Sequence, residues 1–377
     1  MAEKHRFEHN DHTNLAFLLT SVALQALLLW LSYIVYETWV AAFGPGWRPL
    51  EWAFCLLAFT FISATLLAVR YRSWFVRWYY WFAAYWFACI GPLFGGSVLF
   101  VLLEDIGPHV GVSVVPNWAG IISFGVAIGV IIYGMWQSQR VEIVRTTITL
   151  PNLPKSWQGK AVVLVADLHL GNVRGVRFAE KVTRKIRTLA PEMVFIAGDL
   201  YDGLICDASK LIAPLKNLAS PQGTYFVSGN HDYYSDSEHF FRAIQDAGIH
   251  ILNNAVVTID GLQIAGMDFN DTNYPENFKT VLKNIDLDTD KSSILLRHEP
   301  THLEIASQKG FSLQVSGHTH RGQFWPLSLI TRYLFKGYDY GLKQFEKMTV
   351  CTTSGVGTWG PPFRLGTKSE IVAITLT

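Results

Sequence analysis

Five short apolar runs in the second half of the chain each end in side chains that bind metal ions. The side chains are Asp167 and His169 in "VADLHLG", Asp199 in "IAGDLYDG", Asn230 in "VSGNHDYY", His298 in "LLRHEP", and His318 and His320 in "VSGHTHRG". Carboxylate, amide and imidazole groups without a thiolate suit Mn²⁺, Fe, Zn²⁺ or Co²⁺. Seven ligands exceed the needs of one ordinary site. Two metal ions about 3.5–4 Å apart would use them all, and such a pair activates water for attack at phosphorus.

No single motif of this set is specific. D-x-H and G-D arise often by chance, and one histidine beside a strand is usually a hydrogen-bonded core residue. The order D-x-H, G-D, G-N-H-D, H and G-H-x-H, with one motif at the end of each run, is very improbable by accident. We therefore interpret the seven residues as one site.

The elements that must position these residues alternate along the chain. The first, second and third apolar runs are each succeeded by a segment with helical periodicity, at residues 178–189, 209–218 and 237–247. Alternating strands and helices predict an α/β layer fold. Ligands in such folds bind at the carboxyl ends of strands, so the five loops should converge.

The motifs resemble those of the calcineurin-like metallophosphoesterase superfamily. The resemblance covers roughly residues 140 to 377, and the ending "SGVGTWGPPFRLGTKSEI" is similar to the branch of membrane-attached bacterial phosphoesterases. It implies an αββα fold, in which two face-to-face sheets are flanked by helices, and a metal-dependent phosphoric ester hydrolase. It also implies two divalent metal ions, with Mn²⁺ expected and Fe, Zn²⁺ or Co²⁺ as alternatives.

Carried over position by position, the resemblance divides the ligands between the two ions. It assigns Asp167, His169, Asp199 and His320 to one ion, and Asp199, Asn230, His298 and His318 to the other. Asp199 is then the bridge. The resemblance assigns His231 to the leaving-group oxygen, which a histidinium can protonate, and Asp232 is expected to hold the tautomer and orientation of that histidine.

Two arginines are candidates for binding the substrate. Arg297 precedes a ligand histidine, and Arg321 stands where relatives often have a second glycine. Guanidinium groups there would suit non-bridging phosphate oxygens, and a surface arginine is the alternative for each. Asp202 is interpreted as a turn residue or a residue behind the ligands.

An apolar segment, "FWPLSLITRYLFKGYDYG" at residues 324–341, comes after the last ligand. A segment of this composition should not face water without a partner. It either packs on the catalytic sandwich or forms an apolar lip facing the membrane. The lip would favour a lipid-linked phosphate, pyrophosphate or phosphodiester, with Trp325 and Phe335 as candidate substrate-binding residues.

The first part of the chain predicts a transmembrane domain. Four uncharged stretches, at about 15–36, 52–69, 78–103 and 118–136, are each at least as long as the roughly 18 apolar residues that cross a ~30 Å hydrocarbon core. Trp and Tyr crowd their ends. We expect a four-helix transmembrane domain at 1–139 and a metallophosphoesterase domain at 140–377. The pairs Gly91 with Gly95 and Gly125 with Gly129 should let helices approach closely.

Basic residues in the short loops predict the orientation. Lys4, Arg6, Arg70, Arg72, Arg77, Arg140 and Arg145 fall on one side of the predicted spans, and Arg48 falls on the other. The positive-inside rule then places the N-terminus and the catalytic domain in the cytoplasm, on an inner or plasma membrane.

Charge and composition separate the remaining functional classes. Lys plus Arg number 31 against 30 acidic residues, without a basic run, so nucleic acid is not an expected partner. The expected function is a membrane-anchored phosphohydrolase, and a nucleotide or general phosphodiesterase merely tethered to the membrane is an alternative. A non-catalytic sensor or scaffold disagrees with the complete ligand set. A transporter disagrees with three spans that lack Asp, Glu, Lys, Arg and His. The oligomeric state is left open.

Overall fold

The chain forms two compact units, Met1–Tyr133 and Gly134–Thr377. The computed structural model describes residues 2–44 and 48–377, and the side chains of residues 2–18, 48 and 217 are outside this description. The predicted orientation markers Lys4, Arg6 and Arg48 therefore lie outside the described side chains. The second unit begins inside the last transmembrane helix, which ends at Gln139.

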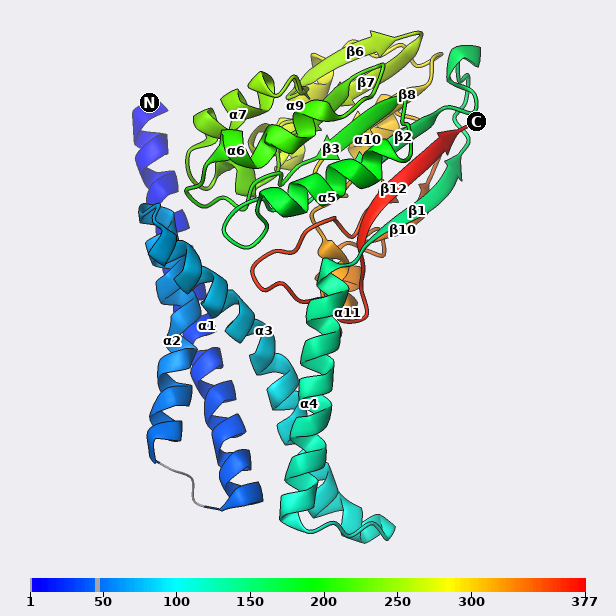
Figure 1. The fold of residues 1–377 in the computed structure, drawn as a ribbon. Coiled ribbons are helices and arrows are strands. Elements are labelled where there is room, and N and C mark those ends of the chain that lie inside the picture. Colours follow the sequence, from blue (N-terminus) through cyan, green and yellow to red (C-terminus); the bar gives the residue numbers. More distant parts are fainter. Residues whose placement is uncertain (1, 45–47) are drawn as a thin grey trace. The chain divides into compact units, whose positions relative to one another are not determined.

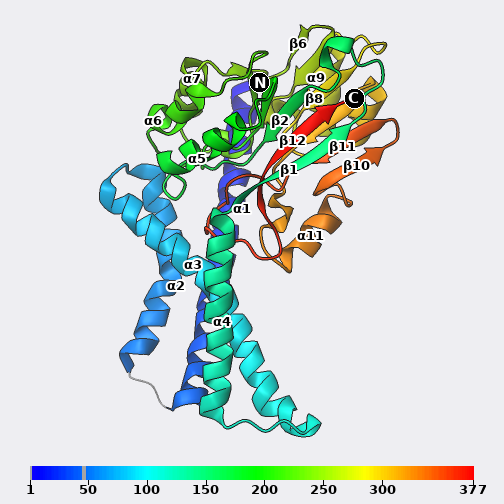
Figure 2. The same ribbon diagram turned by 45° about the vertical axis from the view of Figure 1, so that its right-hand side comes forward.

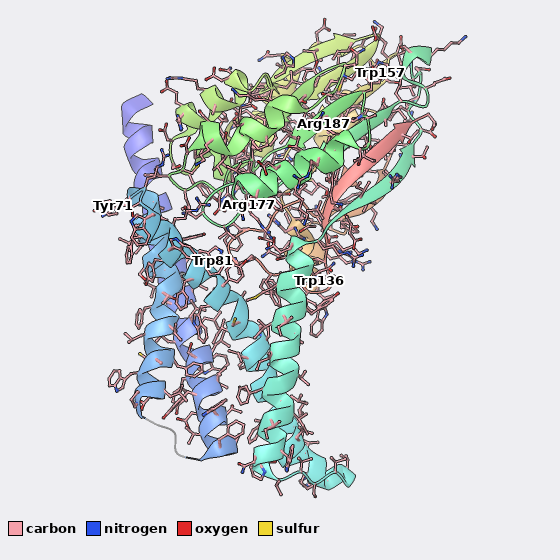
Figure 3. All side chains as sticks on the ribbon, in the orientation of Figure 1. Tyr71, Trp81, Trp136, Trp157, Arg177 and Arg187 are labelled. Atoms are coloured by element: carbon pink, nitrogen blue, oxygen red, sulfur yellow. The ribbon has the colours of Figure 1, made fainter. Side chains whose placement is uncertain are left out.

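Among the described residues, four long apolar helices make up the first part of the chain, and Figure 1 shows them as ribbons. They are α1 (Ala2–Phe43), α2 (Arg48–Arg70), α3 (Trp74–Val101) and α4 (Pro116–Gln139), with short turns η1 (Leu102–Ile106) and η2 (Gly107–Val110) after α3. By length and composition the chain has four segments able to cross a membrane, Leu19–Phe43, Pro49–Arg70, Trp74–Val110 and Pro116–Gln139, of which the third continues from α3 through η1 and η2. The four predicted spans are confirmed. Many large apolar side chains on these helices remain exposed, as lipid-facing surfaces require (Figure 3).

The expected glycine pairs are not the points of close helix approach. A Cβ added at Gly91, Gly95, Gly125 or Gly129 would meet nothing within 4 Å. The close approaches are at two other glycines. A Cβ at Gly96 would lie 3.0 Å from the carbonyl oxygen of Ser123, and one at Gly120 would lie 2.5 Å from the Cβ of Ala42. The spacing of small residues predicted that helices approach closely at glycines. It did not predict which glycines face a neighbouring helix.

Two six-stranded sheets form the second unit, which Figure 2 shows from a second direction. The first sheet has the order β1-β12-β2-β3-β4-β5 and the second has the order β10-β11-β9-β8-β7-β6. The strands of the first sheet are β1 (Val141–Ile148), β2 (Ala161–Val165), β3 (Met193–Ala197), β4 (Thr224–Val227), β5 (His250–Ile251) and β12 (Ser369–Leu376). Those of the second are β6 (Ala255–Ile259), β7 (Leu262–Gly266), β8 (Ser293–Leu296), β9 (Leu313–Ser316), β10 (Gly341–Phe345) and β11 (Met348–Thr352).

Side-chain alternation shows how the layers stack. In β2, Val162 and Leu164 pack in the core between the sheets, whereas Val163 and Val165 pack in the core under the outer helices. Successive strand residues point to opposite faces, so a strand covered on both faces reads as a continuous apolar run. This explains why the apolar runs of the sequence carry no polar alternation.

Helices cover the outer face of each sheet. α5 (Val176–Arg187), α6 (Ala208–Ile212) and α7 (Ser237–Asp246) pack on the first sheet, while α9 (Pro275–Lys283) and α10 (Leu303–Lys309) pack on the second. Short helices α8 (Phe269–Thr272), α11 (Leu327–Leu334) and the turns η3 (Lys155–Trp157), η4 (Ala213–Asn217), η5 (His231–Tyr233) and η6 (His320–Gly322) lie in the connections. The predicted αββα sandwich is confirmed.

The last residues of α4 are built into the sandwich unit. Only Arg140 separates α4 from β1. The Ser138 hydroxyl donates to the carbonyl of Pro362 at 2.8 Å, and the backbone N–H of Arg364 donates to the carbonyl of Gly134 at 3.0 Å. The buried Arg174 guanidinium donates to the Ser138 carbonyl at 2.9 Å. The transmembrane helix therefore ends in a hydrogen-bonded joint rather than in a loose linker.

Candidate metal centre

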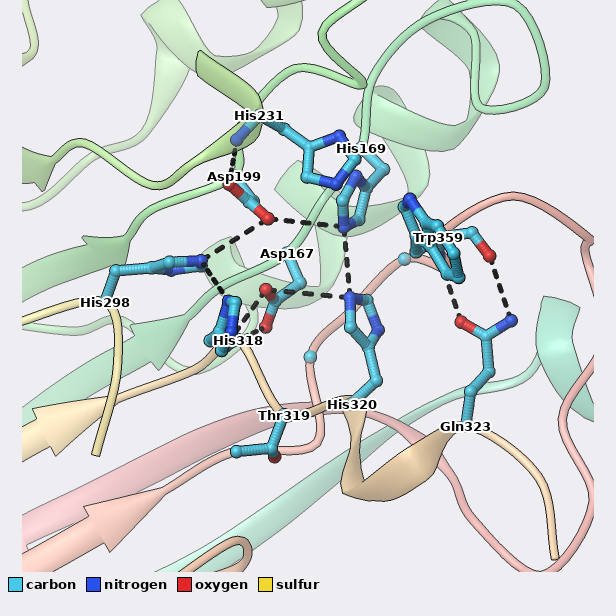
Figure 4. A network of polar contacts seen from close by, with 12 residues as sticks. Asp167, His169, Asp199, His231, His298, His318, Thr319, His320, Gln323 and Trp359 are labelled. Atoms are coloured by element: carbon cyan, nitrogen blue, oxygen red, sulfur yellow. Dashed lines mark hydrogen bonds and ion pairs between the residues drawn. The ribbon is translucent and has the colours of Figure 1, made fainter. Parts of the chain in front are cut away.

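The loops at the carboxyl ends of five strands carry the seven predicted ligands, and six of these side chains, all except Asn230, lie together in one cluster (Figure 4). Asp167 and His169 come after β2, Asp199 after β3, Asn230 after β4, His298 after β8, and His318 and His320 after β9. Three groups of side chains offer ligand atoms that all lie within 4.8 Å of one another: Asp167, His169 and His320; His169, Asp199 and His231; and Asp199, His298 and His318. Because His169 and Asp199 are shared between groups, the three groups form one cluster.

In three of the four ligand-type histidines, one ring nitrogen lies 2.7 to 3.3 Å from an oxygen. His169 Nδ1 lies 3.3 Å from an Asp202 carboxylate oxygen, His298 Nδ1 lies 2.7 Å from the Ala197 carbonyl oxygen, and His318 Nε2 lies 3.1 Å from a Glu299 carboxylate oxygen. Carboxylate and carbonyl acceptors behind a histidine fix its tautomer and orientation at metal sites.

The opposite ring nitrogens converge inside the cluster. His169 Nε2 lies 3.0 Å from His320 Nε2, and His298 Nε2 lies 3.1 Å from His318 Nδ1. Asp199 Oδ2 lies between the two pairs, 3.7 Å from His169 Nε2 and 3.4 Å from His298 Nε2. Nitrogen lone pairs aimed at one another and at a carboxylate are the arrangement that a cation between them would satisfy.

Asn230 has a side-chain oxygen without a hydrogen-bond partner in the described part of the chain, so its role as a ligand stays a prediction. Its Nδ2 donates to the hydroxyl of Tyr234 at 2.6 Å, while its buried Oδ1 has no hydrogen-bond partner among the described residues. Buried polar atoms normally have a partner. The orphaned amide oxygen, the converging imidazoles and the hard donor set all fit a divalent metal ion.

The backbone at the ligands is strained. Asp167, His169, Asp199, His318 and His320 all have positive φ, between 46° and 69°. Residues other than glycine rarely occupy this region, which costs on the order of 1–3 kcal/mol each. Five such residues in one cluster show that the surrounding sheets force the loops into a conformation that the chain alone would avoid.

Glycines at two of the motifs make room for the carboxylates. A Cβ on Gly229 would lie 2.2 Å from Asp199 Oδ1, and a Cβ on Gly317 would lie 2.6 Å from Asp167 Oδ2. Both distances are shorter than any real contact allows. The G-N-H-D and G-H-x-H motifs therefore need their glycines because a carboxylate from another loop occupies the space of the side chain.

Electrostatics in the cluster favour positive charge. Burial lowers the pKa of His298, but the carboxylates of Asp199 and Asp167 outweigh it and raise that pKa to about 10. Burial raises the pKa of Asp199, but His298 and other histidines hold it well below its ordinary value. Burial and the His298 charge lower the pKa of His318 to about 4. The Asp199 and Asp167 carboxylates thus keep a proton on the buried His298 ring. A bound metal ion would supply this positive charge in place of the proton.

His231 joins the cluster, but Asp232 does not orient it. The imidazole Nδ1 of His231 lies 3.2 Å from the carbonyl oxygen of Asp202. The Asp232 carboxylate instead accepts from the backbone N–H groups of Asp199, Gly229 and Tyr201, at 2.9, 2.9 and 3.2 Å. The expected catalytic role of Asp232 is therefore wrong. Neighbouring residues in a turn point in different directions, and Asp232 points into the core, where it ties the second and third motifs together.

The predicted role of Arg297 is also wrong. Its buried guanidinium donates to the carbonyls of Thr272, Glu299 and Thr301 at 2.8 to 2.9 Å and lies 4.9 Å from the ring centre of Phe278. Those bonds occupy Nη1 and Nη2 and hold the loop after β8. An arginine that satisfies several buried carbonyls is a structural residue.

Arg321 lies over an aromatic ring. Its guanidinium carbon is 4.3 Å from the ring centre of Tyr340, whose hydroxyl donates to Glu370 at 3.0 Å. Its assignment to the substrate stays a prediction.

Aromatic side chains flank the cluster. The ring of Phe335 lies 6.0 Å from that of His318, and the ring of Trp359 lies 6.4 Å from that of His231. Gln323 secures the second of these, because its side chain donates to the Trp359 carbonyl at 3.1 Å and accepts from the Trp359 N–H at 2.9 Å (Figure 4). Trp325 is 61% exposed and makes no polar or ring contact with a ligand among the described side chains.

Sequence reasoning missed four residues around the site. Glu299 and Tyr234 hold His318 and Asn230, Trp359 stands beside His231, and Arg364 holds the loop behind Asp167. The Arg364 guanidinium is fully buried and donates to the carbonyls of Ser354 and Gly357, both at 2.7 Å. Two of the four had a signal in the sequence. Glu299 comes directly after the predicted ligand His298, and Arg364 is the single arginine of the Gly- and Pro-rich ending.

Comparisons with known proteins identify the family. Residues 160–322 match the calcineurin-like phosphoesterase family. The chain is 32% identical over 253 residues to an "Uncharacterized metallophosphoesterase" of Aquifex aeolicus, a match that covers 65% of this chain and 95% of that protein. The chain therefore belongs to the calcineurin-like metallophosphoesterase family, a family of metal-dependent phosphoester hydrolases.

Several other similar proteins are longer than the part that matches this chain. A Danio rerio "Transmembrane protein with metallophosphoesterase domain" is 33% identical over 261 residues, which cover 65% of this chain and 60% of that protein. The chain spans 60 to 64% of the length of the first three curated relatives it matches. A solved dimetal phosphatase from Danio rerio is 12% identical, with a TM-score of 0.36, and the likeness covers 58% of this chain and 100% of that one.

Proposed function

We propose that this protein is a membrane-anchored hydrolase that cleaves phosphoester, phosphodiester or pyrophosphate bonds at a dinuclear metal centre. The observation that carries the proposal is the convergence of imidazole nitrogens whose opposite nitrogens, in three of the four rings, lie 2.7 to 3.3 Å from an oxygen. The proposed ligands are Asp167, His169, Asp199 and His320 for one ion, and Asp199, Asn230, His298 and His318 for the other. Mn²⁺ is the expected ion.

The chain's own residues supply the remaining parts of the reaction. When bound, the two ions would supply Lewis acidity and a water of lowered pKa. His231 stands at the edge of the cluster as the proposed acid for the leaving group, with Nδ1 held against the Asp202 carbonyl. Burial lowers the pKa of His231, so its protonated form is a stronger acid but a smaller fraction of the ring is protonated near neutral pH. An alkoxide is a poor leaving group, so its departure is the step that most needs a proton donor such as His231.

The aromatic residues beside the cluster support a lipid-linked substrate. Phe335 and Trp359 place apolar surface next to His318 and His231. Trp359 remains more than half exposed, so it is available to the chain attached to a phosphate. A nucleotide or general phosphodiesterase tethered to the membrane is the second candidate, because the ligand set itself makes no demand on the group attached to the phosphate.

A direct assay separates these candidates. The purified full chain, loaded with Mn²⁺, is tested with p-nitrophenyl phosphate, bis-p-nitrophenyl phosphate and a polyprenyl pyrophosphate in the same vesicles. The proposal expects turnover of at least one ester and a preference for the lipid-linked one. Turnover of the soluble esters alone would favour the tethered phosphodiesterase, and no metal-dependent turnover of any ester would contradict the hydrolase.

The basic residues around the spans support a cytoplasmic catalytic domain. Arg70, Arg72 and Arg77 lie near the junction of α2 and α3, and Arg140 comes directly after α4. A green fluorescent protein fused after Thr377 should fluoresce, whereas alkaline phosphatase at the same point should be inactive. The reverse pair of results would contradict this orientation.

A further inference from the structure

Helix α11 presents an apolar surface that nothing in the sandwich unit covers. None of its eight residues is buried. Tyr333 is 84% exposed, and Leu327, Leu329, Ile330 and Leu334 are exposed as well. We call these five residues together with Trp325 the α11 patch. A helix in a soluble domain normally turns its apolar side to a core, and a contiguous exposed patch of this kind marks an interaction surface.

The α11 patch is joined to the end of a transmembrane helix within the same unit. The ring of Phe363 packs directly on Gly134 of α4, where an added Cβ would lie 2.1 Å from the ring. Phe363 also packs edge-on against Phe324 at 6.0 Å, and the N–H of Trp325 donates to the carbonyl of Leu365 at 2.9 Å. Two packing contacts and one hydrogen bond therefore connect the helix end to the start of α11.

The end of α4 marks the membrane interface in this unit. Trp136 is exposed, and the guanidinium of Arg140 lies 5.3 Å from its ring centre. Tryptophan and arginine at the end of an apolar helix are typical of the boundary between hydrocarbon and water. The joint thus ties the α11 patch to a residue pair at headgroup depth.

The composition of α11 fits a bilayer better than a protein partner. Leu, Ile, Trp and Tyr form the exposed side, and Arg332 and Lys336 lie at its carboxyl end. Aliphatic and aromatic residues accompanied by basic ones are the pattern of helices that lie in the plane of a membrane surface. Basic residues beside it would also meet anionic headgroups.

We propose that the α11 patch inserts into the headgroup region of the bilayer and docks the catalytic unit on the membrane. The occupant of the patch is the lipid bilayer itself. Docking would fix the position of Phe335, directly after α11, and with it one flank of the metal cluster. This inference does not depend on the proposed hydrolysis, because a docked surface can be measured without turnover.

A depth-sensitive probe tests the docking in the full chain. Cys55, Cys89, Cys206 and Cys351 are free cysteines and are replaced by alanine. A new cysteine then carries a bimane label, either by Tyr333→Cys or by the control Tyr274→Cys, which changes a side chain 57% exposed ahead of α9. Both proteins are placed in nanodiscs with lipids that carry a nitroxide near the headgroup.

The proposal expects quenching of the Tyr333→Cys probe to exceed that of the Tyr274→Cys probe several-fold. Equal quenching of both probes would overturn it. Shielding of the Tyr333→Cys probe that appears only when several copies share a disc, without lipid quenching, would assign the patch to a second copy of the chain and would also overturn it.

A second measurement uses the unaltered chain. Vesicles that contain a photoactivatable phospholipid are irradiated, and lipid adducts are located by mass spectrometry. Adducts on the peptide with residues 325–334, and none on the peptide with Tyr274, are expected. Adducts confined to the four transmembrane helices would contradict docking even if the cysteine-free variant failed to fold.

Discussion

The ligand loops and the α11 patch depart from ordinary burial in opposite ways. The loops bury polar side chains such as Asp167, Asp199 and His298 in the interior, whereas α11 leaves apolar side chains such as Leu329 and Ile330 in the open. Each arrangement is unfavourable for the isolated chain. In our proposals each becomes favourable when a partner binds, a cation at the loops and a bilayer at α11. These two departures from ordinary burial are the observations on which both proposals rest.

The largest effect is expected from the centre of the loops. Asp199 lies between the two histidine pairs, so Asp199→Asn should abolish turnover and lower the metal content of both positions, because a neutral amide bridges cations poorly. Activity and metal analysis on the same preparation measure this. Two full equivalents of metal in the variant would contradict the bridging role.

A smaller loss is expected at His231. His231→Ala should slow the reaction roughly 10²- to 10⁴-fold, the usual contribution of a general acid, with metal content unchanged. The loss should shrink for p-nitrophenyl esters, whose leaving group needs no proton.

Asp232→Asn provides the contrast, because Asp232 accepts from three backbone N–H groups. It should lower metal content and lose activity equally on both kinds of ester. Equal losses at His231 for alkyl and p-nitrophenyl esters would argue against the acid.

Changes in the α11 patch should be selective rather than severe. Leu329→Ser combined with Ile330→Ser should reduce turnover of a lipid-linked phosphate several-fold and leave a soluble p-nitrophenyl ester nearly unchanged. Tyr274→Ser, an exposed aromatic outside the patch, should affect neither substrate. Parallel losses on both substrates would mean that α11 supports the fold and not the membrane contact.

The smallest effect is on the pH dependence of stability in metal-free protein. The pKa of His298 is about 10 in the fold and 6.5 ordinarily. The folded state therefore holds the extra proton, and its stabilisation is full below pH 6.5 and is lost as pH rises through 10. After chelation, the melting temperature should fall as the pH rises across this window. His298→Gln should flatten this slope, and an unchanged slope would contradict the assignment.

The convergence of most predicted ligands could be foreseen because it depends on residue type and on position after a strand. Asp167, His169 and His318 each come after an apolar run, and the fold makes those run ends converge. The direction of a side chain is set by a turn whose geometry the sequence does not reveal. This is why Asp232 and Arg297 were assigned to chemistry although both point into backbone groups.

The apolar segment after His320 shows a second limit. Its composition predicted a need for a partner but left open whether the sandwich or the membrane would provide it. The absence of buried residues in α11 supports the membrane alternative, and the sequence does not reveal this burial. Likewise the close helix approaches are at Gly96 and Gly120 rather than at the regularly spaced pairs, because the rotation of each helix decides which glycine faces a neighbour.

The metal stoichiometry of the intact protein tests the central proposal most directly. Full-length chain in detergent is stripped with a chelator, loaded with Mn²⁺, freed of excess metal and measured by elemental analysis and electron paramagnetic resonance. The loops described above predict two ions per chain and the spectrum of a spin-coupled pair, as expected for two ions that share a ligand such as Asp199. One isolated ion, or two without magnetic coupling, would contradict the dinuclear centre.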